Sequence, residues 1–308
     1  MAYLEMQGLS KAFGSVQAVS DLSFSVPKGS IFGLLGPNGA GKTTTIRMIM
    51  RIVLPDAGAV LLEGKPIDEE RRKLLGYLPE ERGLYRKMRV LEHLTFLGEV
   101  RGLPREEASR RARDWLDRLG LSGKAQAKVE ALSKGMQQNV QFAAALIHDP
   151  PLVILDEPFT GLDPIATRQF KDVILALRER GVTVLFSTHV LPQAEELCDG
   201  YCLINKGRTV FSGSAEALKT RYGSMLVKVT TADGKALPSP LPGVLSMSQK
   251  QGTYLLRLAE NVTVPQLVRL LAPTVDLTSV EIYQPTLEEI FLRAVEEDAG
   301  EASHVSLA

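Results

Sequence analysis

The sequence predicts an α/β fold built on a parallel sheet, followed by a smaller second domain. Short apolar runs such as Ile31–Leu35 and Leu152–Leu155 are typical of strands buried on both faces, and helical patterns alternate with them. A glycine-rich turn from the first of these strands into a helix marks the edge of such a sheet where ligands bind. At 308 residues the chain exceeds one typical domain, which agrees with this division.

The glycine-rich turn has the sequence Gly36-Pro37-Asn38-Gly39-Ala40-Gly41-Lys42-Thr43-Thr44, a phosphate-binding loop in its expected strand–loop–helix setting. Its glycines let backbone N–H groups point at phosphate oxygens, with the helix N-terminus behind them. We expect Lys42 to reach the β- and γ-phosphates and the Thr43 hydroxyl to ligate Mg²⁺. A plain structural turn is the alternative, but the complete pattern favours binding of a nucleoside triphosphate.

Two strands, Tyr3–Phe13 and Leu22–Val26, are predicted before the loop. Phe13 at the end of the first either stacks on a base or packs in the core. After the loop helix, two further strands are predicted at Ala59–Gly64 and Leu74–Leu78, and Glu80 follows the second.

A helical pattern extends from Leu91 to Gly120, and its arginines alternate with acidic residues. This alternation favours a solvated helix face over a nucleic-acid-binding face.

The strand at Leu152–Leu155 runs directly into Asp156 and Glu157. Here Asp156 is expected to hold Mg²⁺ through its water shell, and Glu157 to polarise an attacking water. The alternative is a strand end with two solvated acids, which the phosphate loop upstream makes the weaker interpretation. Downstream, Asp163 precedes Pro164 as a helix N-cap, and a strand at Thr183–Phe186 leads to His189, a residue more often structural than catalytic in such a place.

Residues 222–298 change character and predict a small mixed α/β domain, with 299–308 as a flexible tail. Short strand-like runs and a helix at Val264–Leu271 precede a capping box formed by Thr286 and Glu289. The helix after this box carries one apolar stripe, composed of Leu287, Ile290, Phe291 and Val295.

The composition restricts the function further. Thirty-six basic and thirty-six acidic residues give a formal net charge of zero, which argues against broad nucleic-acid binding. The two cysteines, Cys198 and Cys202, are expected to be free thiols in a reducing cytosol. We expect neither a signal peptide nor a membrane span, so any role at a membrane needs a partner chain.

These motifs in this order resemble the ATP-binding subunit of an ABC transporter over residues 1–221, with a helical subdomain at about 85–150. The resemblance implies a P-loop NTPase fold with a RecA-like core and an antiparallel β subdomain. The matched positions are Phe13 for the aromatic that stacks on adenine, Gly36–Thr44 for Walker A, Glu80 for the Q-loop, Leu132–Gln137 for the signature motif, Leu152–Glu157 for Walker B, Gly161-Leu162-Asp163 for the D-loop and His189 for the switch histidine.

The resemblance implies that two copies pair head to tail and clamp two ATP molecules with Mg²⁺ between them. In that arrangement Ser133 and Gly135 of one copy contact the γ-phosphate bound by the other, and closure drives a separate membrane permease. Two positions depart from the usual pattern: Glu80 replaces a glutamine, and Lys134 replaces a glycine. Glu80 is itself a competent hard-metal ligand, so the departure concerns coupling to the permease more than Mg²⁺ binding.

A narrower similarity, carried by Gly76–Tyr85 and by the second domain, is to ABC-2 type exporter cassettes of sodium-extrusion and drug-resistance systems. It implies a peripheral location on the cytoplasmic face of a bacterial or archaeal membrane. The alternatives are an importer cassette and a non-transport ABC ATPase of the translation or DNA-repair type. The latter kinds usually carry two cassettes or a long coiled coil, and this chain has one Walker A motif and no heptad run.

Overall fold

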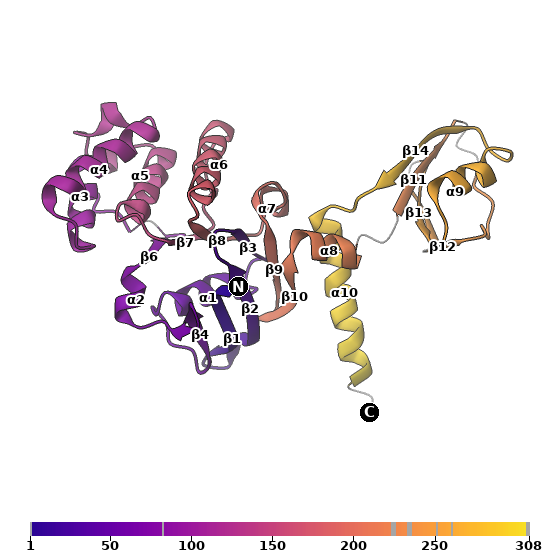
Figure 1. Ribbon diagram of the computed structural model, residues 1–308, viewed down its shortest axis with the longest axis horizontal. Coiled ribbons are helices and arrows are strands. Elements are labelled where there is room, and N and C mark those ends of the chain that lie inside the picture. The colour runs from indigo at the N-terminus through magenta and orange to yellow at the C-terminus, as the bar shows by residue number, and fades with distance from the viewer. Residues whose placement is uncertain are drawn as a thin grey trace. The chain divides into compact units, whose positions relative to one another are not determined.

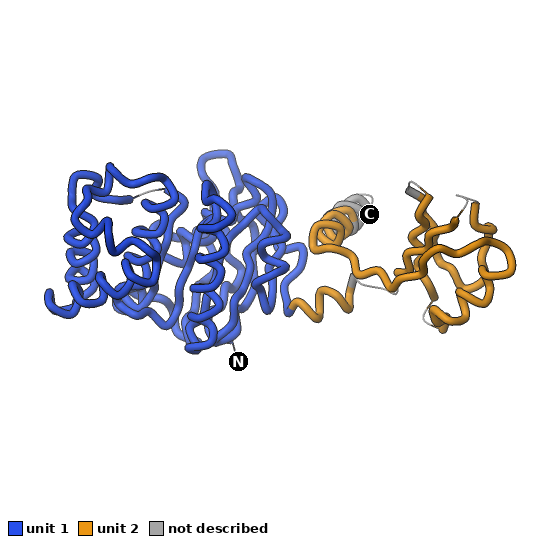
Figure 2. Tube along the Cα trace, turned by 90° about the horizontal axis from the view of Figure 1, so that it is seen from above, with its two compact units in different colours: residues 1–214 blue, residues 215–308 orange. Residues whose placement is uncertain are grey.

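The computed structural model describes residues 2–81, 83–222, 226–232, 236–250, 252–259 and 261–305. The chain divides into two compact units, residues 1–214 and 215–308, which Figure 2 shows in different colours. This division falls seven residues before the boundary expected from the sequence, because helix α8 (Ala215–Tyr222) groups with the second unit.

A six-stranded sheet forms the centre of the first unit, in the order β10-β9-β3-β8-β7-β6. Its middle strands are parallel, and only β10 runs antiparallel to its neighbour. This is the predicted parallel sheet. The strands are β3 (Ile31–Leu35), β6 (Leu75–Leu78), β7 (Leu152–Asp156), β8 (Thr183–Thr188), β9 (Gly200–Asn205) and β10 (Arg208–Ser214).

A second, antiparallel sheet lies against one face of the first, with helix α1 (Lys42–Ile49) on the same side (Figure 1). Apolar side chains from both sheets and α1, including Leu4, Leu34 and Ile46, form one core cluster. The order is β2-β1-β4-β5, with β1 at Ala2–Phe13, β2 at Val16–Pro27, β4 at Ala57–Leu62 and β5 at Lys65–Pro66.

Helices α5, α6 and α7 lie on the other face of the parallel sheet (Figure 1). The helical pattern at 91–120 forms two helices rather than one, because Gly102 adopts a φ of 90° and Pro104 follows it. The predicted cap at Asp163 is confirmed, since its side chain accepts a hydrogen bond from Ala166 N at 2.9 Å. The helices are α2 (Glu69–Lys73), α3 (Val90–Val100), α4 (Arg105–Arg118), α5 (Lys134–Leu146), α6 (Pro164–Glu179) and α7 (Leu191–Leu197), with short 3₁₀ turns at Ser122–Lys124 and Val129–Ala131.

The second unit contains an antiparallel sheet in the order β12-β13-β11-β14, whose core includes Leu267 and Leu271 of α9 (Val264–Leu271). Its strands are β11 (Leu226–Thr231), β12 (Val244–Lys250), β13 (Thr253–Leu258) and β14 (Leu277–Tyr283). Strand β12 was not predicted, because its side chains at an edge of the sheet are mostly exposed and the apolar alternation is weak.

Helix α10 (Leu287–Val305) begins at the predicted capping box, where Thr286 N donates to Glu289 at 3.0 Å. Leu287 and Ile290 are buried, so the apolar stripe is largely covered. The helix continues through residues 299–305 of the expected flexible tail, and residues 306–308 lie outside the described part. Among the described residues, no helix combines the length and the apolar character that crossing a membrane requires.

Candidate nucleotide site

The phosphate loop leaves strand β3 and enters helix α1 with the backbone curled as the motif requires. Gly39 and Gly41 adopt φ angles of 79° and 103°, a region that side chains other than hydrogen strain to reach. At Gly36 the constraint is space, because a Cβ atom there would lie 2.2 Å from the carbonyl oxygen of Ile204. No side chain in the described part of the chain caps α1, so its first N–H groups remain available to an anion.

Lys42 lies across the loop. Its ammonium, almost fully buried, donates to the carbonyl oxygens of Gly36 at 2.7 Å and Pro37 at 3.1 Å, and lies 3.5 Å from a Glu157 carboxylate oxygen. The other side of that carboxylate faces His189, whose Nδ1 is 3.0 Å and 3.1 Å from the two oxygens. Lysine, glutamate and histidine therefore form one cluster at the carboxyl ends of β7 and β8.

Asp156 is the most deeply buried acid of this cluster. Burial raises the pKa of its carboxyl above the ordinary value, while hydrogen bonds from Ser187 and Thr43 act to lower it. Its Oδ1 accepts from Ser187 Oγ at 2.6 Å and from Thr43 Oγ1 at 3.3 Å, whereas its Oδ2 is buried without a partner among the described residues. A buried acceptor without a partner is costly, so this oxygen and the adjacent threonine suit a hydrated cation such as Mg²⁺.

The cavity in front of these residues has a volume of about 430 Å³. Glu80, on the loop after β6, also lines it and is the further carboxylate that the sequence assigned to the metal. The predicted site residues that line the cavity are Asn38, Gly39, Gly41, Lys42, Thr43, Thr44, Glu80, Glu157 and His189.

Other predicted residues lie elsewhere. Phe13 is half exposed with Lys11 Nζ 5.7 Å from its ring centre, and it is not among the residues that line the cavity. Ser133 caps α5 by accepting from Met136 N at 3.3 Å and is exposed, as is Asp163 at the start of α6. Gly135, on the first turn of α5, is half buried. None of Ser133, Gly135 and Asp163 lines the cavity of its own chain.

Sequence reasoning missed several residues around the cavity. Val16, Gln17 and Ala18 line it from strand β2, and Thr160 lines it from the loop after Glu157. The Ser187 hydroxyl connects the two acids, because it donates a hydrogen bond to Asp156 and accepts one from Glu157 N at 3.0 Å. Only the pairing of β7 with β8, which sets Asp156 beside Ser187, reveals this role.

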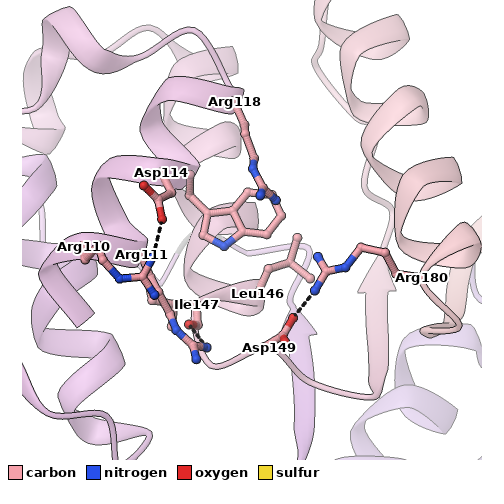
Figure 3. A pocket seen from close by; sticks show the side chains of 9 residues that line it. Arg110, Arg111, Asp114, Arg118, Leu146, Ile147, Asp149 and Arg180 are labelled. Atoms are coloured by element: carbon pink, nitrogen blue, oxygen red, sulfur yellow. Dashed lines mark hydrogen bonds and ion pairs between the residues drawn. The ribbon is translucent and has the colours of Figure 1, made fainter. Parts of the chain in front are cut away.

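A second charged pocket lies between α4 and the ends of α5 and α6 (Figure 3). Its arginines are already occupied: Arg180 pairs with Asp149 at 2.7 Å, and Arg118 stacks on Trp115 with 5.1 Å to the ring centre. Arg110 and Arg111 both bind Glu107, which holds the pKa of that carboxyl at about 2. We interpret this pocket as structural.

Comparison with known proteins identifies the family of the chain. The family model for "ABC transporter" matches residues 19–160, and the model for the C-terminal domain of "ATP-binding protein DrrA1-3-like" matches residues 213–295.

Among individual proteins, the chain is 36% identical over 292 residues to the uncharacterized ABC transporter ATP-binding protein YhaQ of Bacillus subtilis, covering 95% of this chain and 98% of the relative. It is 37% identical over 300 residues to the Nod factor export ATP-binding protein I of Ralstonia nicotianae, covering 94% and 92%.

A solved structure of the ATP-binding subunit of an ABC transporter superposes with a TM-score of 0.67 at 33% identity, covering 72% of this chain and 93% of that one. Fold, cavity and relatives agree. The chain belongs to the ABC transporter ATP-binding proteins and is an ATP-binding and ATP-hydrolysing subunit of a transporter.

Proposed function

We propose that two copies of this chain pair head to tail around two ATP molecules and drive a separate membrane permease in export. One observation carries the pairing: the residues assigned to the nucleotide fall into two groups within one chain. Lys42, Thr43 and Glu157 surround the cavity, whereas Ser133 and Gly135 start a helix that points elsewhere. A helix N-terminus binds anions well, so a second copy that presents α5 would complete the site.

The chemistry follows from the cluster of Lys42, Glu157 and His189. When ATP binds, its phosphates accept hydrogen bonds from the Lys42 ammonium, which lies 3.5 Å from the Glu157 carboxylate, and Glu157 is then free to act on water. The freed carboxylate acts as general base on the attacking water, and His189 orients it from the opposite side. Thr43, Asp156 and Glu80 would hold Mg²⁺, whose charge offsets that of the β- and γ-phosphates.

The export assignment rests on relatives rather than on the cavity. The Ralstonia relative is described as an export protein, and the match of the DrrA1-3-like C-terminal domain covers residues 213–295, most of the second unit. In this proposal the permease carries the substrate contacts, and the chain acts peripherally at the cytoplasmic face of the membrane. In this proposal the second unit stabilises the dimer.

Glu157→Gln tests the proposal. It should leave ATP binding intact, lower turnover by about 10²–10⁴-fold, and accumulate as an ATP-bound dimer on size exclusion. Glu179→Gln at the exposed end of α6 is the matched control and should behave as the wild type. Hydrolysis near the wild-type rate in Glu157→Gln would reject Glu157 as the base, and a monomer under saturating ATP would reject the pairing.

A further inference from the structure

Two glutamines of helix α5 point into the protein instead of into solvent. Gln138 and Gln141 are three residues apart and thus share a helix face, and they are only 4% and 5% exposed. Gln141 Nε2 donates to the carbonyl oxygens of both Pro79 and Glu81, each at 3.1 Å. Gln138 Nε2 donates to the carbonyl oxygen of Pro158 at 3.3 Å.

Those carbonyls belong to the loops that carry two cavity residues. Pro79 and Glu81 flank Glu80, so the amide of Gln141 holds the backbone on both sides of that carboxylate. Pro158 follows Glu157 directly. One helix therefore holds both loops, and Gln141 is itself flanked by Val140 and Phe142, which are fully buried and apolar.

The amide is the group that this position needs. Two carbonyl oxygens can be satisfied only by a donor, and a neutral amide places two N–H bonds on one nitrogen without burying a charge. Its Oε1 is buried without a partner among the described residues, which costs desolvation free energy. The two hydrogen bonds to the loop carbonyls offset this cost.

We propose that Gln141 is a positioning residue that fixes Glu80 at the nucleotide cavity and, together with Gln138, joins the loops of Glu80 and Glu157 to α5. The consequence for coupling rests on the proposed function. In that scheme the start of α5 contacts the nucleotide bound by the second copy. Pairing of the two copies would therefore shift α5, and α5 would in turn shift the Glu80 and Glu157 loops at the site of its own chain.

The first test is Gln141→Met, which keeps the length and volume of the side chain but removes the Nε2 hydrogen-bond donor. A second variant, Gln141→Glu, keeps the shape of the side chain and replaces the same donor by a carboxylate oxygen. In the nucleotide-free protein, amide hydrogen exchange at Glu80 and Glu81 should accelerate roughly tenfold, as expected for the loss of a hydrogen bond. Thr95→Val is the control: it removes a buried bond to Leu91 O inside α3, so it should lower thermal stability without changing exchange in this loop. Unchanged loop exchange in Gln141→Met overturns the inference.

The second readout is the Mg²⁺ concentration for half-maximal ATPase. It should rise about tenfold in Gln141→Met, the usual cost of losing an outer partner of a metal ligand. Glu80→Ala should shift it as well, and the double variant should equal Glu80→Ala alone, because Gln141 acts through Glu80. Additive shifts in the double variant would overturn the inference. Faster loop exchange with no Mg²⁺ shift in either single variant would support the positioning and reject the metal role of Glu80.

Discussion

The nucleotide cavity and the arginine pocket are both lined by charged residues, and Figure 3 shows the arginine pocket. The two sites differ in how far their polar groups are already paired within the protein. The arginine pocket has more positive charge, but each guanidinium is paired with a carboxylate or stacked on a ring. The nucleotide cavity is lined by a single lysine and the uncapped start of α1, and behind Thr43 lies Asp156, whose Oδ2 is buried without a partner among the described residues.

The difference teaches that unmet hydrogen-bonding capacity, rather than the number of charges, distinguishes a binding site from a structural one. A paired arginine must lose one partner to gain another, so an anion gains little there. At the start of α1 no side chain of the described residues competes for the N–H groups that would bind a phosphate. Four predictions challenge this comparison, in order of decreasing effect.

The largest effect on ATP binding is expected when one positive charge is removed from the nucleotide cavity, compared with the removal of one from the arginine pocket. Lys42→Ala should weaken ATP binding about 10²-fold, because charged hydrogen bonds to the phosphates are lost. Arg118→Ala in the arginine pocket should keep ATP affinity within about twofold and lower stability by about 0.5–1 kcal/mol through the lost stacking on Trp115. Binding of a fluorescent ATP analogue measures both, and equal losses would refute the comparison.

The second prediction concerns the close approach of Gly36 to the Ile204 carbonyl and changes no charge. Gly36→Ala should lower the free energy of unfolding by about 1–3 kcal/mol, because its Cβ would meet the Ile204 carbonyl. Gly123→Ala is the control, since a Cβ there has open space and no positive φ is recorded for it. Urea denaturation compares the two variants. A Gly36→Ala protein as stable as Gly123→Ala would show that the loop is not held by this close approach.

A third prediction concerns His93, a buried side chain that lacks hydrogen-bond partners in the part of the chain that the structure describes but needs no ligand, because it can remain neutral. His93 on α3 is fully buried, neither ring nitrogen has a hydrogen-bond partner among the described residues, and burial lowers its pKa to about 4. The native state keeps it neutral, whereas the unfolded chain protonates it below about pH 6.5.

Stability should therefore fall as the pH drops from about 6.5 to 4, with about 1–2 kcal/mol lost at pH 5 from this group. His93→Phe should flatten that part of the stability profile measured by urea titration. A profile identical to the wild type would mean that His93 takes up its proton over the same pH range in the native and unfolded states.

The smallest effect is expected from removal of the second unit. A chain that ends at Ser214 keeps every nucleotide residue and should bind ATP normally. If the second unit stabilises the dimer, ATPase should fall several-fold at dilute protein and recover as concentration rises, by mass action. Sedimentation and activity across a dilution series check this. An unchanged concentration dependence would assign the second unit to the permease instead.

The sequence predicted those site residues that belong to short contiguous motifs. The loop from Gly36 to Thr44 and the Asp156-Glu157 pair are local patterns, and the cap at Asp163 depends on three residues. The contributions of Gln17 and Ser187 depend on which strands lie side by side, and that of Gln141 on how α5 packs, which no local pattern records. The edge strand β12 was missed because its exposed side chains give a weak apolar alternation, whereas the break at Gly102 is a local signal that the helical pattern obscured.

The most direct test of the account mixes two inactive chains. Lys42→Ala lacks the lysine of its own cavity, and Ser133→Ala lacks the contact it would offer to the second copy. In a head-to-tail pair both lesions fall in one composite site and leave the other intact.

We predict that each variant alone has negligible ATPase and that an equimolar mixture recovers activity in proportion to the mixed dimer. A mixture as inactive as its components, with mixed dimers shown to form, would contradict the shared site.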